Sequence, residues 1–200
     1  MKVIQRLSAT CARNIIELGK LKEINESVLR YGCELILTSI FGLMILIGLS
    51  VLIGHPFAWV FFVIGFAPSR TSAGGYHADT HARCYIITSS MFLVSVITAY
   101  FLEWNRYGYL AITVFSAILI WIMAPLAATN KPLSTKRYRL NRMRCQFIIC
   151  VNVGLSLIFA VLNWVCEEIS LYYAGVFFAA ASLIMGKIKN AWKGGKKNEE

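Results

Sequence analysis

Charged residues are scarce in this 200-residue chain: only 15% of it is Asp, Glu, Lys or Arg, and Asp79 is the one aspartate. Soluble domains carry about 25% charged residues, so this composition argues against a soluble globule. The chain has only four prolines, and its 14 glycines follow no repeat, which excludes collagen-like and low-complexity chains. The six cysteines show no framework spacing, which excludes a disulfide scaffold.

Hydrophobic residues make up 58% of the chain and are gathered in long runs. A helix needs about 20 apolar residues to cross the hydrocarbon core of a membrane. A short run, Phe57–Ala67, has only 11 residues and covers roughly half the core. Five further runs come close to the full length: Leu35–Ile53, Tyr85–Leu102, Tyr107–Leu126, Gln146–Val165 and Ile169–Met185. We therefore expect an all-α integral membrane protein with six transmembrane helices, the second one short.

Positive charge lies between the apolar runs and alternates along the chain. The net charge is +10; residues 1–32 and 127–145 hold six Lys or Arg each, residues 68–84 hold two, and the tail holds five. In the intervening loops, Arg106 is the only Lys or Arg. Because Lys and Arg mark cytoplasmic loops, this pattern predicts a multi-pass cell-membrane protein with both termini in the cytoplasm and no secretory signal peptide. We expect no nucleic acid partner, since no aromatic and basic surface remains outside the runs.

The chain is expected to form a single polytopic membrane domain over residues 1–200. Apolar residues recur at three- and four-residue steps from Ile4 to Val28, which predicts an amphipathic cytoplasmic helix within residues 1–32. This helix can lie on the anionic inner leaflet of the lipid bilayer, or it can pack on the rest of the protein. Residues 35–186 are then the six-span bundle, and residues 187–200 are a basic cytoplasmic tail.

Residues 127–145 are basic and interrupted by Pro132, so we expect a loop or short helix there. Contact with lipid headgroups is one interpretation of its charge. The other is a docking surface for an acidic peptide segment, with Lys131, Lys136 and Arg137 as the candidate residues.

Ionisable residues gather in residues 69–84, between the second and third spans. This stretch holds two of the three histidines, the one aspartate and Cys84. Ionisable groups at membrane depth are costly and by default indicate a functional site. Gly74 and Gly75 permit a sharp turn or a close backbone approach in the same stretch.

Cys84 is the candidate nucleophile, because a histidine base within reach can remove the proton of a cysteine thiol and leave a nucleophilic thiolate. If Asp79 or Thr80 caps the third span, Cys84 lies in or just past the first turn, where the helix dipole favours a thiolate. His77 then precedes the cap and can fold back over that turn, whereas His81 is a rival base three residues before the thiol. Spacing alone slightly favours His81. In the alternative interpretation, Cys84 is a small buried apolar residue.

Other functions are compatible with the same stretch. A metal site at His77, Asp79, His81 and Cys84 is a weak hypothesis, because CxxC and HExxH patterns are absent. We therefore expect neither a metal nor a cofactor. A small transporter or channel could line its pathway with residues 69–84, and a membrane scaffold would need none of them.

The run Arg70-x4-Gly75-x-His77-x6-Cys84 resembles the accessory gene regulator protein B (AgrB-like) family of membrane cysteine endopeptidases. The amphipathic start, the number of spans and the later run Ala124-Pro125…Asn130-Lys131-Pro132 extend the resemblance to nearly the whole chain. It implies cleavage of the C-terminal part of a short amphipathic quorum-sensing precursor (AgrD-like) through an acyl-enzyme thioester. It also implies cyclisation of the product to a thiolactone or lactone.

The resemblance assigns roles to individual residues. It implies that His77 is the catalytic base and Cys84 the nucleophile, in place of the spacing preference for His81. Arg70 and Gly75 match further family positions, as residues that support the site or contact the oxyanion or the substrate. Association of the protein as a homodimer is a further expectation from the resemblance.

Overall fold

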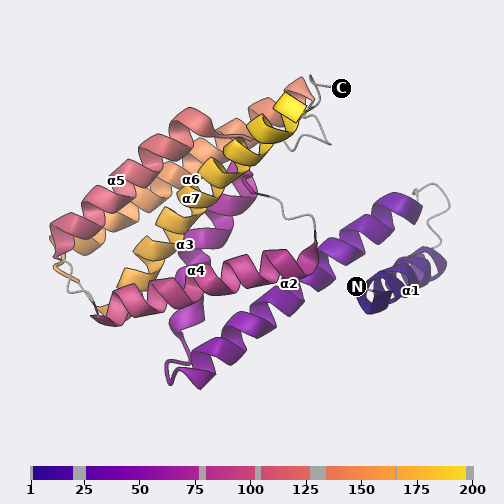
Figure 1. The fold of residues 1–200 in the computed structure, drawn as a ribbon, viewed down its shortest axis with the longest axis horizontal. Coiled ribbons are helices and arrows are strands. Elements are labelled where there is room, and N and C mark those ends of the chain that lie inside the picture. The colour runs from indigo at the N-terminus through magenta and orange to yellow at the C-terminus, as the bar shows by residue number, and fades with distance from the viewer. Residues whose placement is uncertain are drawn as a thin grey trace.

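Seven α-helices make up the described part of the computed structural model, which comprises residues 2–19, 26–76, 80–101, 105–126, 134–164 and 166–196 (Figure 1). In chain order they are α1 Lys2–Gly19, α2 Glu26–Leu52, α3 Ala58–Ala73, α4 His81–Phe101, α5 Arg106–Met123, α6 Thr135–Val161 and α7 Glu167–Lys196. These ranges contain no strand, only an isolated parallel bridge between Gly74 and Leu126. The prediction of an all-α fold is confirmed: an amphipathic helix precedes the six helices that were expected as transmembrane spans, and five of these six are long and apolar enough to cross a membrane.

Five of the helices, α2 and α4 to α7, are long and apolar enough to cross a membrane. The helix α3 has 16 residues and extends about 24 Å, less than the core thickness of about 30 Å. The second hydrophobic helix is therefore the short one, as predicted. It ends where Gly74 turns the chain, with the Gly74 N–H bonded to the Arg70 carbonyl.

Three helices extend differently from the predicted segments. The first helix ends at Gly19 and α2 begins at Glu26, so residues 26–32 continue the first span. The helix α6 begins at Thr135, so most of the basic segment 127–145 is helical, and α7 continues to Lys196. Each added helical residue gains a hydrogen bond once a helix is nucleated, and Lys and Arg are good helix formers, so the helices extend past their apolar runs.

Small residues attach α1 to α2. Ser8 and Ala12 are fully buried, whereas the larger apolar residues Leu7, Ile15 and Leu18 are exposed. Three large apolar side chains of α1 therefore remain exposed on the described protein. This arrangement favours the expectation that α1 lies on a membrane surface.

The helix α7 lies at the centre of the molecule and packs against α3, α4 and α5. With α3, α5 and α6 it forms a bundle, and α2 and α4 lie beside that bundle (Figure 1). Glycines allow α3 and α7 to approach closely. A Cβ on Gly65 would lie 2.3 Å from the Tyr172 carbonyl oxygen, and one on Gly175 would lie 2.5 Å from that of Phe62.

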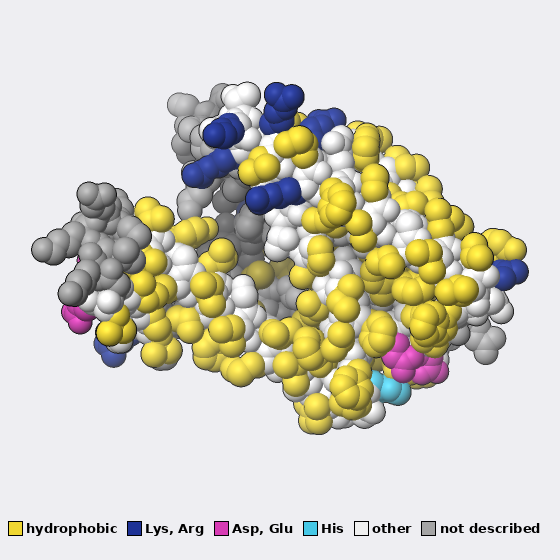
Figure 2. All heavy atoms as spheres, turned by 180° about the vertical axis from the view of Figure 1, so that it is seen from behind, with side chains coloured by type: hydrophobic (Ala, Val, Ile, Leu, Met, Phe, Trp, Pro, Cys, Tyr) yellow, Lys and Arg dark blue, Asp and Glu magenta, His cyan; other side chains and the backbone are white. Residues whose placement is uncertain are grey.

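Charged side chains divide between the two ends of the bundle (Figure 2). Lys and Arg gather at the end that contains the first turns of α6 and the last turns of α7, which we call the basic end. Glu167 and Glu168 begin α7 at the opposite end. The candidate site described next lies at the basic end.

Candidate functional site

The site begins where α3 ends, at a turn that only glycine accommodates well. Gly74 has φ +78° and Gly75 has φ +131°, both in the region that L side chains rarely adopt. A Cβ on Gly74 would lie 2.5 Å from the Leu126 carbonyl oxygen, and one on Gly75 would lie 2.4 Å from Nη1 of Arg70. The two glycines thus combine the sharp turn and the close approach that the sequence predicted.

Arg70 holds this turn from within the fold. Its half-buried side chain donates from Nη1 to the Gly74 carbonyl at 2.7 Å and from Nη2 to the Tyr76 carbonyl. A planar guanidinium suits such a double contact, which a lysine ammonium cannot reproduce. Arg70 therefore fixes the carbonyl groups on both sides of Gly75.

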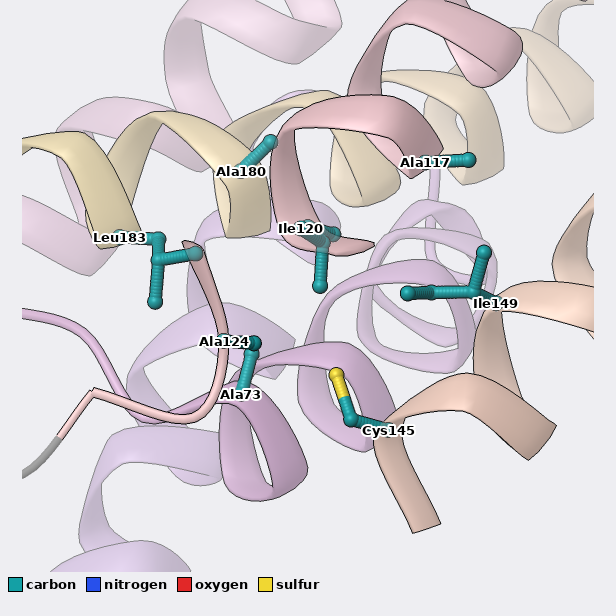
Figure 3. Close-up of a cluster of buried hydrophobic side chains, with 8 residues drawn as sticks. All are labelled: Ala73, Ala117, Ile120, Ala124, Cys145, Ile149, Ala180 and Leu183. Atoms are coloured by element: carbon teal, nitrogen blue, oxygen red, sulfur yellow. The ribbon is translucent and has the colours of Figure 1, made fainter. Parts of the chain in front are cut away.

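A cluster of buried apolar side chains supports the turn (Figure 3). Its members come from α3, α5, α6, α7 and the segment after α5: Ala73, Ala117, Ile120, Ala124, Cys145, Ile149, Ala180 and Leu183. Ala73 and Ala124 lie close together in this cluster (Figure 3), and the Leu126 N–H donates to the Ala73 carbonyl at 2.9 Å. The turn is thus anchored to a core that four helices share.

Cys84 lies on the other side of the site, in the first turn of α4. The Thr80 hydroxyl accepts a hydrogen bond from the Arg83 N–H at 3.3 Å, and the Thr80 carbonyl accepts one from the Cys84 N–H at 3.2 Å. The expected cap is therefore Thr80, and it places Cys84 in the first turn of the helix. Its side chain is exposed, so the alternative of a buried apolar cysteine is wrong.

His81 has a partner that the sequence did not indicate. Its Nε2 lies 3.1 Å from Oε1 of Glu34 on α2, and the Tyr85 hydroxyl donates to the Thr38 carbonyl of α2 at 3.2 Å. These two contacts attach the first turns of α4 to α2. Among the described residues, no hydrogen bond joins His81 to Cys84, so the geometry does not add to the spacing preference for His81 as base.

Several predicted residues lie outside the described residues: His77, Asp79, Asn130, Lys131 and Pro132. The chain that flanks His77 is described on both sides, at Tyr76 and at Thr80. His77 therefore follows directly on the turn that Arg70 holds. Of the predicted docking residues, Lys136 and Arg137 are exposed in the first turn of α6.

A buried polar network, which no sequence motif indicated, begins at Ser69, next to Arg70 in the chain. Asn152 on α6 donates from Nδ2 to the Ser69 hydroxyl at 3.0 Å and accepts from the Tyr172 hydroxyl at 2.7 Å. All three side chains are buried, and they join α3, α6 and α7. An asparagine inside an apolar run was the available signal, since polar groups at membrane depth need partners.

Residues of α7 also contact the turn, at Tyr76. The Tyr76 N–H donates to the Ser182 carbonyl at 2.8 Å, and Nζ of Lys189 lies 4.8 Å from the centre of the Tyr76 ring. No motif marked these α7 residues, because only the folded bundle brings them to the turn.

A cavity of about 340 Å³ lies between α4, α5 and α7, with Tyr109 and Ser170 among its lining residues. It lies beside the first turns of α5 and α7, at the end opposite Cys84. The cavity is therefore not part of the candidate site.

Comparison with known proteins provides independent evidence for the family. No curated protein and no solved structure matches this chain. The family model for accessory gene regulator B matches residues 4–186, which is most of the chain. This family implies involvement in the processing of agr quorum-sensing peptides, of the AgrD-like precursor type. The chain belongs to the accessory gene regulator B (AgrB) family.

Proposed function

We propose that this protein is a cysteine endopeptidase of the cell membrane, with both termini in the cytoplasm, that cleaves a short quorum-sensing precursor peptide and promotes its cyclisation. The observation that carries the proposal is the exposed thiol of Cys84 in the first turn of α4, seven residues after His77 in the motif. In a chain of the AgrB family, this thiol is the described group best suited to act as a nucleophile.

The reaction starts with proton transfer from the Cys84 thiol to His77, and the sulfur then attacks the carbonyl carbon of the scissile peptide bond. The C–N bond breaks, His77 returns the proton to the leaving amine, and the peptide remains attached to Cys84 as a thioester. A cysteine thiol or serine hydroxyl within the peptide attacks the thioester carbonyl, which releases Cys84 and closes a thiolactone or lactone. A site that excludes water favours this ring closure over hydrolysis.

Arg70 and Gly75 are supporting residues in this proposal. Arg70 fixes the carbonyls of Gly74 and Tyr76, on both sides of Gly75 and directly before His77 in the chain. Gly75 is buried against Arg70 and Ser182, where a side chain would collide with both. Its lack of a side chain is thus its contribution, and the geometry favours this role over that of a donor to the oxyanion.

The substrate reaches the site from the membrane surface at the basic end. Exposed Lys136 and Arg137 on α6 fit an acidic segment of the precursor, and Lys131 belongs to the same basic segment of the sequence. An amphipathic peptide would meanwhile bind the anionic inner leaflet. Two copies of the chain acting as a homodimer complete the proposal.

The test is co-expression of the full chain with the short precursor peptide encoded beside it, with mass spectrometry of the peptide products. We expect wild-type protein to yield a C-terminally truncated fragment, and a fragment lighter by one water to report cyclisation. Cys84→Ala and His77→Ala should yield neither. His81→Gln is the matched control, because it changes the other histidine near the thiol and should still process the peptide.

Three outcomes would contradict the proposal. Processing by the Cys84→Ala protein would show that Cys84 is not the nucleophile. Loss of processing in His81→Gln together with full activity in His77→Ala would reverse the assignment of the base. Intact peptide with the wild-type protein and the variants alike would contradict the endopeptidase and favour transport through residues 69–84.

A further inference from the structure

The last turns of α7 reach the turn that leads to His77, although the two segments are far apart in the sequence. The helix α7 has 30 residues and extends about 45 Å, which exceeds a hydrocarbon core of about 30 Å. Its C-terminal turns therefore project beyond the core at the basic end. There they contact the backbone of Gly75 and Tyr76.

Gly186 makes the closest of these contacts. A Cβ on Gly186 would lie 2.6 Å from the carbonyl carbon of Gly75 and 2.7 Å from the backbone nitrogen of Tyr76. Both neighbours are backbone atoms, so neither can rotate away as a side chain could. The contact therefore depends on the absence of a side chain at residue 186. Gly154 on α6 provides a contrast, because a Cβ there would meet nothing within 4 Å.

Tyr76 is attached to α7 on both sides of Gly186. About one turn earlier on the helix, the Ser182 carbonyl accepts a hydrogen bond from the Tyr76 N–H at 2.8 Å. About one turn later, Nζ of Lys189 lies 4.8 Å from the centre of the Tyr76 ring, a cation–π contact. Since Arg70 binds the Tyr76 carbonyl, both backbone polar groups of this residue are fixed.

Tyr76 directly precedes His77 in the chain, and consecutive Cα atoms are about 3.8 Å apart, so a shift of Tyr76 is passed on through a single peptide unit. A base must come within hydrogen-bonding distance of the proton that it takes. An alanine at residue 186 would force the turn and α7 apart by roughly 1 Å, and a displacement of that size can cost about a hundredfold in rate.

We propose that Gly186 is a positioning residue for the base: it lets α7 hold Tyr76, the residue that directly precedes His77 in the chain. This inference rests on the proposed function, in which His77 activates the Cys84 thiol. It adds α7 to the site as the element that fixes the base from outside the motif.

The experiment measures the rate at which N-ethylmaleimide modifies Cys84 as a function of pH, by mass spectrometry of the Cys84 peptide from membranes that contain the full chain. The variants are Gly186→Ala, its matched control Gly154→Ala, His77→Ala, and the double variant Gly186→Ala/His77→Ala. Exposed Cys11 on α1 reports on reagent access in the same samples. Each variant is also compared with wild type for recovery from the membrane.

We expect Gly186→Ala to lower the Cys84 rate at pH 7 by roughly tenfold and to shift its pH profile toward that of His77→Ala, because a thiol without a base is only a few per cent ionised at pH 7. Gly154→Ala should match wild type. In the His77→Ala background, Gly186→Ala should have no further effect on the Cys84 rate. If Gly186 had a merely structural role, its substitution would change that rate with or without His77.

The outcomes separate the two proposals. If His77→Ala leaves the Cys84 profile unchanged, the proposed base is wrong, and the positioning role is overturned with it. If His77→Ala shifts the profile and Gly186→Ala does not, only the positioning role is overturned. If Gly186→Ala is not recovered from the membrane, Lys189→Gln decides: a smaller shift in the same direction supports the role, and an unchanged profile overturns it.

Discussion

The packing of α3 against α7 should respond sharply to a single methyl group at Gly65. In Gly65→Ala, the added Cβ would lie 2.3 Å from the Tyr172 carbonyl oxygen and 3.2 Å from the Val176 nitrogen. The two helices must then separate by roughly 1 Å, and overpacking of this kind costs about 1–3 kcal/mol. Alanine offsets about 1 kcal/mol of this cost through its higher helix propensity. We therefore expect a net loss of about 0–2 kcal/mol relative to wild type.

The assay is thermal unfolding of the purified full chain in detergent. For chains of 150–250 residues, 1 kcal/mol shifts the midpoint by about 2–4 °C, so Gly65→Ala should lower it by up to roughly 8 °C. Gly154→Ala is the control, because nothing lies within 4 Å of its Cβ position. It should match wild type or exceed it by the propensity gain alone. A midpoint for Gly65→Ala equal to that of Gly154→Ala would refute the close-packing argument.

Three further predictions concern the site and its supports. Arg70→Lys should lower peptide processing roughly tenfold or more, because one ammonium cannot hold both carbonyls of the turn; unchanged yields by mass spectrometry would contradict this. Burial raises the pKa of the Cys166 thiol, so N-ethylmaleimide should modify Cys166 more slowly than exposed Cys11 at pH 7. The difference between the two rates should narrow as the pH rises through the raised pKa. Equal rates at pH 7 would contradict this prediction. Asn152→Ala should lower the unfolding free energy by about 1–2 kcal/mol, because the buried hydroxyls of Ser69 and Tyr172 lose their hydrogen bonds to Asn152. An unchanged midpoint of thermal unfolding would show that these hydroxyls find other partners.

The helices could be predicted from the sequence because their apolar runs match the length that a membrane requires. Their ends could not, since the bounds depend on how far each helix continues beyond the hydrocarbon. Thus α6 begins at Thr135, well before the predicted span, and α7 continues to Lys196. The short α3 was visible in the sequence, because its apolar run was short and two glycines followed it.

Local rules accounted for part of the candidate site. Thr80 caps α4 and Cys84 follows in the first turn, as capping preferences and spacing predicted. The pairing of His81 with Glu34 could not be predicted, since the two residues are 47 positions apart in the chain. Nothing in the motif spacing indicated that α2 would supply the partner.

The sequence by itself determined the helical membrane class, the distribution of basic residues and the motif residues, because each depends on composition or on neighbours along the chain. Only the tertiary structure decided that Arg70 holds the turn around Gly75 and that α7 meets Tyr76 at Gly186. The physical reason is that close packing is a property of pairs of surfaces. A glycine allows close approach wherever it stands, but only the folded bundle decides which backbone comes to lie against it.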